Sequence, residues 1–447
     1  MTICSLDSRY NKETSSVEKI FNNQNLQKNR VKVECLWLIE FIKATNTPFK
    51  DDEIQKIKSI FIKFDDSDYQ NILEIESRIN HDIKACEYFV IEKLNQMQLQ
   101  KFVPLVHFGL TSEDIDTSSY ALLLKEANKE FLNQIKKLSD HLKVEAKKYA
   151  SSPILSLTHG QPATPTTFGK EIVNFLVRID KQINKLSEFQ LETKIAGSTG
   201  NYQSLHHTYP NVDWELVSSD FSKNLNLQIN HYNTQILPKE NWLEQLFHTN
   251  SINLILLDMS KDFWGYIQRN VLSLKVNEQE VGSSTMPHKV NPINFENAEG
   301  NFEFANQIFQ FFQTKLPVSR FQRDLSDKTS LRNLGLFYGY TTLAISSMIK
   351  GLSKVKLNQI HSQNELEENA EVLTELIQTM MRKYSIESSY EKLKELSRGK
   401  KMTLDILKDF INKLDLPNDV KQILISTKAQ DYTGLATKLT LEYLSNK

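Results

Sequence analysis

From Glu113 to Ser152 the chain contains neither glycine nor proline, the two residues that most readily interrupt a helix. The apolar residues of this stretch recur at intervals of three and four: Leu124, Ala127, Phe131, Ile135, Leu138, Leu142, Ala146 and Tyr149. That spacing is typical of one face of an α-helix. A helix of about 35 residues is roughly 50 Å long, because each residue adds about 1.5 Å. Such helices are stable when several pack side by side, so the stretch predicts a long-helix bundle.

Helix-breaking residues are rare in the whole chain, which has 13 glycines and 11 prolines in 447 residues. The first glycine is Gly109. A second long helix is predicted over residues 170–196, and further long helical segments over 241–275, 296–316 and 331–355. We therefore expect an all-α protein.

Three helical domains are expected. Residues 1–110 form an N-terminal domain, with helices before the break at Asn46-Thr47-Pro48, through Ile54–Phe61 and from Ile72 to Leu94. Residues 111–353 form the central bundle. Residues 354–447 form a small domain of shorter helices, with a break at Asp415-Leu416-Pro417. Residues 197–240 are the least helical and are expected to line a site as loops.

Composition excludes several classes of protein. With 40% hydrophobic and 24% charged residues the chain is an ordinary globular sequence. A net charge of −1 argues against a nucleic-acid or anionic-membrane partner. We see no signal peptide and no apolar run near the ~20 residues of a membrane span. Cys4, Cys35 and Cys86 lack the spacing of a zinc site and fit reduced thiols in the cytoplasm.

The segment from Val281 to Pro292 cannot extend a helix, because its prolines lack the N–H group. It carries hydroxyl, imidazole, ammonium and carboxamide groups and almost nothing apolar. The segment is either a connector with a Ser-rich turn or a working loop. Composition alone leaves both interpretations open.

Other polar clusters follow glycines. Thr111 and Ser112, after Gly109, suit either a helix N-cap or the binding of a substrate carboxylate. His159 lies in a Gly-Gln-Pro turn and is either structural or a general acid. His81 carries the same ambiguity, the adjacent Asp82 could simply cap a helix or pair with a cation, and His107 could simply pack against the Thr-Ser cluster.

Seven motifs together resemble one family: DSRY (7–10), NHDIKACEYF (80–89), VHFGLTSEDI (106–115), THGQPATP (158–165), NTQILP (233–238), GSSTMPHKVNP (282–292) and LPVSRFQRDLSD (316–327). The loop at 282–292 is similar to the signature loop of the fumarase/aspartase superfamily. The first two motifs and SRFQRD point to its purine branch, the adenylosuccinate lyases in their longer bacterial form.

The resemblance implies β-elimination of fumarate in purine nucleotide biosynthesis. The substrates would be adenylosuccinate, giving AMP, and succinylaminoimidazole carboxamide ribotide, giving AICAR. It implies no metal and no cofactor. It also implies a cytoplasmic homotetramer whose bundles merge into a twenty-helix core, with each active site shared between three subunits.

The resemblance also assigns roles to residues. Ser283 is the expected general base and Ser284 a substrate ligand, although the sequence does not settle which serine takes which role. Lys289 and Asn291 would stabilise the developing dianion, His159 would be the general acid, and His81 would bond nearby. The matched phosphate-binding residues are Arg9, Tyr10, Arg323 and Arg332. The residues matched to the succinyl carboxylates or neighbouring groups are Thr111, Ser112, Gln235 and Asn297. The expected substrate-binding set also includes Asn80, Asp82, His107, Thr329 and Ser330.

One position departs from the family pattern. Related enzymes usually place a small hydroxyl residue, next to the phosphate, where this chain has Lys328. The lysine could act as a substitute cation, or Thr329 could take over the contact.

The residues disfavour two alternative functions. An argininosuccinate lyase or aspartase-like enzyme would leave Arg9, Arg323 and Arg332 without a common anion, which disfavours it. A non-catalytic helical scaffold, like the lens crystallins related to argininosuccinate lyase, is disfavoured because the loop serines, Lys289 and His159 are all present.

Overall fold

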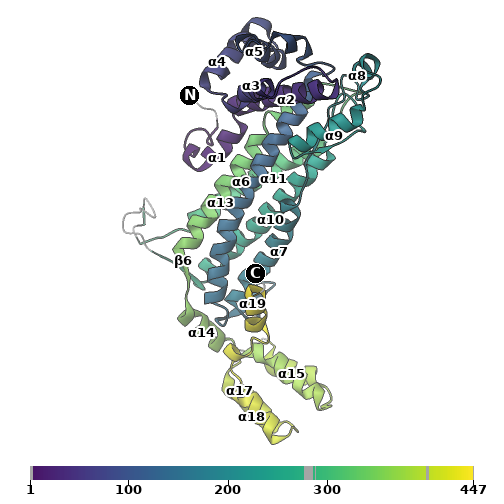
Figure 1. Cartoon of the computed structure of the whole chain (residues 1–447). Helices are drawn as coiled ribbons and strands as arrows, with labels where there is room; N and C mark the ends of the chain where they lie inside the picture. The colour runs from purple at the N-terminus through teal and green to yellow at the C-terminus, as the bar shows by residue number, and fades with distance from the viewer. Residues whose placement is uncertain (1–3, 276–284, 287, 399–401, 446–447) are drawn as a thin grey trace. The chain divides into compact units, whose positions relative to one another are not determined.

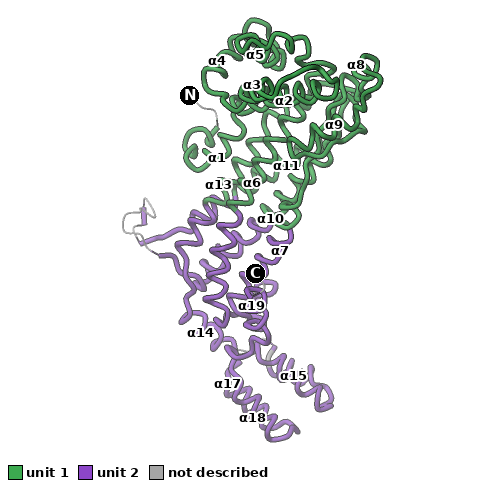
Figure 2. Tube along the Cα trace, in the orientation of Figure 1, with its two compact units in different colours: residues 1–134, 182–254, 300–346 green, residues 135–181, 255–299, 347–447 purple. Residues whose placement is uncertain are grey.

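The computed structural model describes residues 4–275, 285–286, 288–398 and 402–445 of the chain. The fold is mostly helical (Figure 1) and forms two compact units (Figure 2). The first unit contains residues 1–134, 182–254 and 300–346, and the second contains 135–181, 255–299 and 347–447. The predicted domain boundaries at residues 110 and 353 are not tested by this division and stay a prediction.

Five long helices contribute residues to both units: α6 (Ser112–Lys148), α7 (Phe168–Ser187), α10 (Glu240–Gln268), α11 (Ile293–Lys315) and α13 (Leu334–Lys354). The long segments predicted from the scarcity of glycine and proline are thus confirmed. The predicted end of the second helix at Ala196 is wrong, because α7 ends at Ser187. From Leu191 the backbone bonds to another strand instead: the Gln228 amide donates to the Leu191 carbonyl at 2.9 Å.

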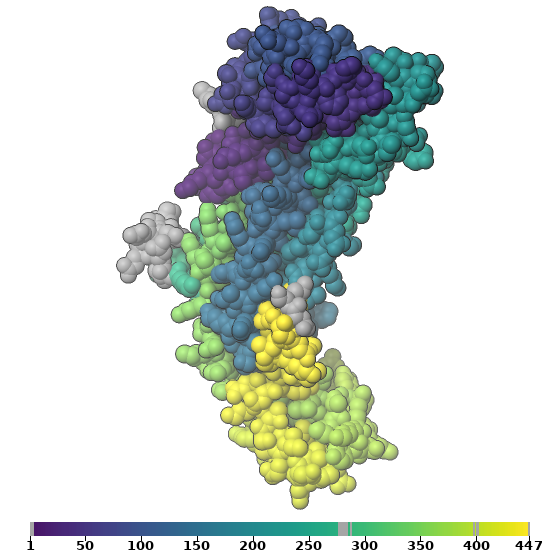
Figure 3. All heavy atoms as spheres, viewed as in Figure 1, coloured from purple at the N-terminus to yellow at the C-terminus, as the bar shows by residue number. Residues whose placement is uncertain are grey.

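In the N-terminal part of the first unit, purple to dark blue in Figure 3, one apolar core lies among residues 31–106, and the backbone forms a series of helices. These are α1 (Asn11–Phe21), α2 (Asn23–Ala44), α3 (Asp51–Ile62), α4 (Asp66–Ile79), α5 (Asp82–Gln96) and the 3-10 helix η1 (Gln100–Leu105). The helix predicted from Ile72 to Leu94 is wrong as a single element. Asn80, with φ of 53°, ends α4 in the left-handed conformation, and His81 caps the start of α5.

The rest of the first unit packs the long helices through buried side chains. Gln245 of α10 donates to the Leu124 carbonyl of α6 and to the Tyr338 hydroxyl of α13, both at 3.1 Å. Phe309 of α11 and Phe337 of α13 place their ring centroids 6.3 Å apart. The connecting elements are β3 (Glu192–Thr193), α8 (Gln203–Thr208), α9 (Trp214–Asn224), β4 (Gln228–Ile229) and α12 (Ser326–Leu331). Residues 197–240 therefore hold two short helices as well as the expected loops.

The second unit contains small antiparallel sheets that the sequence did not predict. β1 (Pro153–Thr158) pairs with β2 (Gln161–Thr167), and β5 (Leu272–Leu274) pairs with β6 (Val355–Leu357). The segment predicted only as a turn at 158–165 is thus the tip of a β-hairpin.

The C-terminal residues of the second unit form short helices, as predicted. They are α14 (Gln359–Glu368), η2 (Ala370–Leu373), α15 (Thr374–Lys383), α16 (Ser389–Ser397), α17 (Leu404–Lys413), α18 (Asn418–Ser426), η3 (Ala429–Asp431) and α19 (Ala436–Ser445). Helices α15 to α18 share a core that includes Ile377, Met381 and Ile411. The predicted break at residues 415–417 separates α17 from α18 and is confirmed.

Candidate active site

The predicted site residues belong to both units of the fold. The first unit contains Arg9, Tyr10, Asn80, His81, Asp82, His107, Thr111, Ser112, Gln235, Arg323, Thr329, Ser330 and Arg332. The second contains His159, Lys289, Asn291 and Asn297. Ser283 and Ser284, the predicted base and its neighbour, lie outside the described residues.

The Asn80-His81-Asp82 motif forms the break between α4 and α5. The backbone of Asn80 is left-handed, and the His81 Nδ1 atom accepts a hydrogen bond from the Lys84 amide at 3.1 Å. His81 therefore acts as a helix N-cap, and its side chain is 51% exposed. Asp82 points into a cluster of charges, so the pairing role left open by the sequence is confirmed.

This cluster joins two aspartates to three cations, and its residues come from four helices or their ends. Arg30 of α2, which is only 1% exposed, lies 3.0 Å from Asp82 and 2.6 Å from Asp116 of α6. The Lys328 ammonium lies 2.8 Å from Asp82 and 3.0 Å from Asp116. Arg332 lies 3.5 Å from Asp82, and its side chain is 61% exposed. With three cations and two carboxylates, the cluster has a formal charge of +1.

The cations keep Asp82 ionised. Burial on its own would raise the pKa of Asp82, but the Arg30 charge and the hydrogen bond and charge of Lys328 together hold that pKa well below its usual range. Lys328 thus pairs with the two neighbouring aspartates, and its predicted role as a substitute cation at the phosphate stays a prediction. The exposed Arg332 guanidinium carries the positive charge that faces outward.

A second buried charge cluster lies at the start of α6. Glu113 accepts a hydrogen bond from Arg323 at 2.6 Å, and Arg323 also lies 3.6 Å from Asp327. Behind Glu113 the fully buried Lys239 ammonium stands 3.8 Å from the carboxylate and 4.1 Å from the centre of the Trp242 ring. Burial raises the pKa of Glu113 and lowers that of Lys239, although their opposite charges counteract both shifts.

Thr111 and Gln235 are each held by a hydrogen bond to a nearby residue. Thr111 precedes α6, and its amide donates to Asp114 at 2.9 Å, which is half of a capping box. The Gln235 side chain donates to the Ser198 carbonyl at 2.9 Å. The N-cap interpretation of Thr111 is therefore confirmed, while its half-buried hydroxyl leaves the ligand interpretation open.

A cavity of about 240 Å³ adjoins the first charge cluster. Its lining includes Gln27, Arg30, Asp82, Tyr120 and Arg332. A second cavity of about 300 Å³, lined by Asp7 and Thr14 among others, shares Arg332 with the first. Arg332 therefore borders both cavities.

The remaining predicted residues of the first unit differ in exposure. Arg9 is exposed, with its guanidinium carbon 5.6 Å from the centre of the Tyr10 ring. Thr329 is exposed, whereas Ser330 is buried and donates to the Ser326 carbonyl at 3.2 Å. Of the two hydroxyls, Thr329 is therefore the one accessible to a ligand.

His107 forms a buried ion pair. Its Nδ1 atom lies 2.6 Å from the Glu34 carboxylate, whose side chain is fully buried. Burial opposes protonation of the imidazole, but the charge and hydrogen bond of Glu34 raise the pKa of His107 above its usual value. The packing interpretation of His107 is thus supported by a specific partner.

This ion pair predicts how stability depends on pH. Because the folded-state pKa of His107 is raised, its stabilisation is fully present below about pH 6.5, the usual histidine value, and is lost as pH rises through the raised pKa. Replacing Glu34 by Gln should make the free energy of unfolding depend less on pH in this range. Urea denaturation of the wild type and the variant between pH 6 and pH 9 measures this dependence. The same pH dependence in both proteins would contradict the stabilising role of the His107–Glu34 ion pair.

In the second unit, His159 sits at the tip of the β1–β2 hairpin. His159 and Gly160 have φ of 54° and 71°, the pattern of a two-residue type I′ turn. Histidine is one of the residues that tolerate this conformation. The turn leaves His159 exposed.

Of the other predicted residues of the second unit, Lys289 and Asn291 lie in the signature loop and Asn297 follows it. Lys289 is exposed, and its amide donates to the Met286 carbonyl at 3.1 Å. Asn291 is half-buried just before α11. Asn297 lies on α11 and accepts a hydrogen bond from Ser347 of α13 at 2.5 Å, so its carboxamide is oriented by a neighbouring helix.

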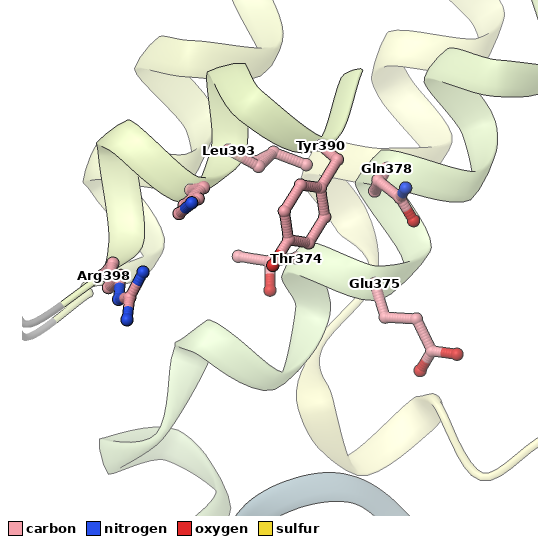
Figure 4. A pocket seen from close by; sticks show the side chains of 7 residues that line it. Thr374, Glu375, Gln378, Tyr390, Leu393 and Arg398 are labelled. Carbon is pink, nitrogen blue, oxygen red and sulfur yellow. The ribbon is translucent and has the colours of Figure 1, made fainter. Parts of the chain in front are cut away.

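A separate pocket of about 530 Å³ lies in the C-terminal residues between α15 and α16 (Figure 4). Its lining residues are Thr374, Glu375, Gln378, Tyr390, Leu393, Lys394 and Arg398, none of which belongs to the predicted site. Among the described residues, no group of three or more His, Cys, Asp or Glu side chains has the arrangement of a metal site. No helix in the described part of the chain is both long and apolar enough to cross a membrane.

Sequence reasoning did not identify Arg30, Asp116, Asp114, Lys194, Glu113 or Lys239 as contributors to the site. For Arg30 in α2 and Asp116 in α6, the available signal was a charged residue within a helical pattern that is predicted to be buried. Such a residue is expected to be paired when buried. The pattern does not identify its partner, which here is 86 residues away.

Comparison with known proteins first defines the class. A family model described as a lyase matches residues 8–306, and one described as the adenylosuccinate lyase C-terminal region matches residues 319–433. A fumarate lyase structure from Mesorhizobium sp. BNC1 has a TM-score of 0.79 at 14% identity, covering 97% of this chain and 98% of that chain. A 3-carboxy-cis,cis-muconate lactonizing enzyme from Pseudomonas putida has a TM-score of 0.75 at 16% identity, covering 96% of each chain. The fold is that of the fumarate-lyase class.

Sequence relatives narrow the class further. Adenylosuccinate lyase from Haemophilus influenzae is 43% identical over 440 residues, which are 97% of this chain and 96% of the relative. The same enzyme from Escherichia coli is 43% identical over 446 residues, which are 98% of this chain and 97% of the relative. The chain belongs to the adenylosuccinate lyase family, and the family predicted from its motifs is confirmed.

Proposed function

We propose that this fumarate-releasing lyase acts in purine biosynthesis on two substrates. It releases fumarate from adenylosuccinate, giving AMP, and from succinylaminoimidazole carboxamide ribotide, giving AICAR. The observation that carries the proposal is the 43% identity to adenylosuccinate lyases over almost the whole chain. The described charge clusters fit this proposal, since they hold the exposed Arg332 and the partly exposed Arg323 beside largely buried carboxylates.

The elimination needs a base, an acid and a site for the developing negative charge. Ser283 removes the proton from the succinyl carbon beside a carboxylate, and Ser284 binds the substrate. Lys289 and Asn291 stabilise the resulting dianion, since fixed positive and N–H groups act most strongly where charge develops. His159 protonates the departing nitrogen, and its exposed place on a tight turn supports this role. His81 bonds nearby.

The nucleotide phosphate is bound by arginine side chains together with Tyr10. Arg9 and Arg332 are exposed and suit a phosphate, whose oxygens match the guanidinium fork. Arg323 donates a hydrogen bond to Glu113, so to bind the phosphate it must either contact both groups or release Glu113. Lys328 neutralises Asp82 and Asp116 and thereby reduces their repulsion of the phosphate. The exposed Thr329 supplies a hydroxyl, and the buried Ser330 supports its turn.

The succinyl carboxylates and neighbouring groups are bound by Thr111, Ser112, Gln235 and Asn297. Thr111 precedes and Ser112 begins the 37-residue helix α6, whose first-turn N–H groups favour an anion. Asn80, Asp82 and His107 complete the substrate-binding set. No cofactor or metal takes part, and the enzyme acts in the cytoplasm, which cell fractionation would check.

We also propose a homotetramer with a twenty-helix core and active sites shared between three subunits. Exposed apolar side chains on the long helices support an interface: Phe247 and Leu254 on α10, and Phe304 and Phe311 on α11, are each at least half exposed. Light scattering should give four times the 51.8 kDa chain mass. A monomer at micromolar concentration would contradict the proposal.

Substrate choice tests the proposed function. Purified protein should release fumarate from adenylosuccinate and from the imidazole ribotide but not from argininosuccinate. The dephosphorylated nucleoside of adenylosuccinate should react with a kcat/KM lower by about 100-fold or more, because each charged hydrogen bond that is lost costs about 1.5–3 kcal/mol. Equal kcat/KM values with and without the phosphate would contradict the proposed binding of the phosphate by these arginines. Release from argininosuccinate alone would replace the proposed substrate.

A further inference from the structure

Asp114 is a fully buried carboxylate with four hydrogen-bond donors around it. Its Oδ1 atom accepts from the Ala196 amide at 3.0 Å and lies 2.8 Å from the Lys194 ammonium. Its Oδ2 atom accepts from the Thr111 amide at 2.9 Å and from the Gly197 amide at 3.1 Å. A carboxylate has about four lone-pair sites, so every acceptor position of Asp114 is occupied.

Lys194 is equally enclosed, and its side chain is 0% exposed. Besides Asp114, its ammonium donates to the Gln235 carbonyl at 2.7 Å and to the Gly197 carbonyl at 3.3 Å. An ammonium has three N–H donors, and these three partners use all of them. The Asp114–Lys194 pair is therefore a closed unit with no bond left for a ligand.

The pair fixes three chain segments that are far apart in sequence. Asp114 holds the start of α6 at Thr111 and the segment at 196–197, and Lys194 holds the loop at Gln235. The segments before α6 and at residue 197 lie very close together: a Cβ atom on Gly197 would stand only 3.1 Å from the Gly109 carbonyl oxygen. Thr111 and Gln235 are the residues that we assign to the succinyl half of the substrate.

We propose that the Asp114–Lys194 pair positions Thr111 and Gln235 for the succinyl carboxylates, an inference that rests on the proposed function. A buried ion pair contributes little net stability because desolvation of both charges is costly. Its effect here is geometric. A displacement of about 1 Å in a substrate-positioning group can cost about 100-fold in rate. Neither residue touches the substrate, so both are positioning residues.

Replacing Lys194 by Met tests the proposal. The variant keeps a side chain of similar length but frees the Gln235 carbonyl and leaves Asp114 with three donors. We expect kcat/KM for adenylosuccinate to fall by about 10- to 100-fold, mainly through a higher KM. The Kd of AMP, which lacks the succinyl group, should stay within about twofold.

Lys125→Met is the matched control. Lys125 also donates to two backbone carbonyls about a hundred residues away, those of Leu225 at 3.1 Å and Asn226 at 3.2 Å, but holds no assigned substrate residue. Its substitution should leave KM and kcat unchanged. A change shared by both variants would indicate a general loss of rigidity and overturn the positioning role.

A double-variant cycle with Gln235→Ala separates this proposal from the proposed function. If Gln235 binds substrate, Gln235→Ala alone raises KM; no effect would count against the proposed function. If Lys194 acts through Gln235, adding Lys194→Met to Gln235→Ala changes kcat/KM by less than about threefold. Independent, multiplying losses would overturn the positioning role, as would weaker AMP binding.

Lys194→Gln covers the case in which the Met variant does not fold. It retains an N–H donor for the Gln235 carbonyl but lacks the charge, so its KM should lie between those of the wild type and Gln235→Ala. A wild-type KM in a folded Lys194→Gln protein would overturn the requirement for the ion pair.

Discussion

Replacing His159 by Asn should lower kcat for fumarate release by about 10²- to 10⁴-fold, the usual contribution of a positioned general acid. Asparagine is chosen because it also tolerates a positive φ and is favoured in type I′ turns before glycine. The hairpin should therefore persist while the acid is lost. KM should change little, because His159 is assigned to the chemical step rather than to binding. Steady-state assays with adenylosuccinate measure both constants.

His207→Asn provides the control for this experiment. His207 is also exposed, and its ring nitrogen lies 2.8 Å from the Gln203 carbonyl in α8, outside the assigned site. Its substitution should leave kcat unchanged. A His159→Asn enzyme with at least half of the wild-type kcat and an intact circular dichroism spectrum would show that another group protonates the leaving nitrogen.

Replacing Arg30 by Met should destabilise the protein by about 3–5 kcal/mol, because removing one partner of a buried ion pair leaves uncompensated charge. Arg30 bonds to Asp82, Asp116 and Gln27, and Lys328 alone would then face both aspartates. Because the pKa of Asp82 is depressed, its stabilisation is present above about pH 4 and is lost as pH falls through the folded-state value. The variant should show a weaker loss of stability on acidification.

Urea denaturation at one protein concentration measures both effects. Arg178→Met is the matched control, because Arg178 pairs with Asp258 at 2.7 Å while their side chains are 39% and 51% exposed. An exposed pair contributes about 0–1 kcal/mol. Similar losses in the two variants would contradict the assigned importance of the buried cluster.

The sequence predicted the long helices well and their interruptions poorly. The stretch from Glu113 to Ser152 has no helix breaker and strong periodicity, and α6 fills almost all of it. Between Ile72 and Leu94 there is also no glycine or proline, yet the helix stops at Asn80. The stop depends on a left-handed asparagine and a histidine cap, which single-sequence periodicity does not reveal. The end of α7 was missed because strand pairing with a distant segment determines it.

In the candidate site, too, one part was predicted from the sequence and another was not. Motif resemblance predicted which residues to examine, and family membership is confirmed by the relatives. The partners of those residues were not predicted: Glu34 for His107, Glu113 for Arg323, and Arg30 with Lys328 for Asp82. These contacts join helices far apart in the sequence, and only the tertiary fold brings them together.

Fumarate release from adenylosuccinate, measured for the wild type beside Ser283→Ala, tests the central claim most directly. We expect steady release by the wild type and a kcat lower by at least about 10³-fold in the variant, because nothing replaces the missing base. Substantial activity in the variant would transfer the base role to Ser284 or another group. No fumarate from well-folded wild-type protein would contradict the proposed reaction itself.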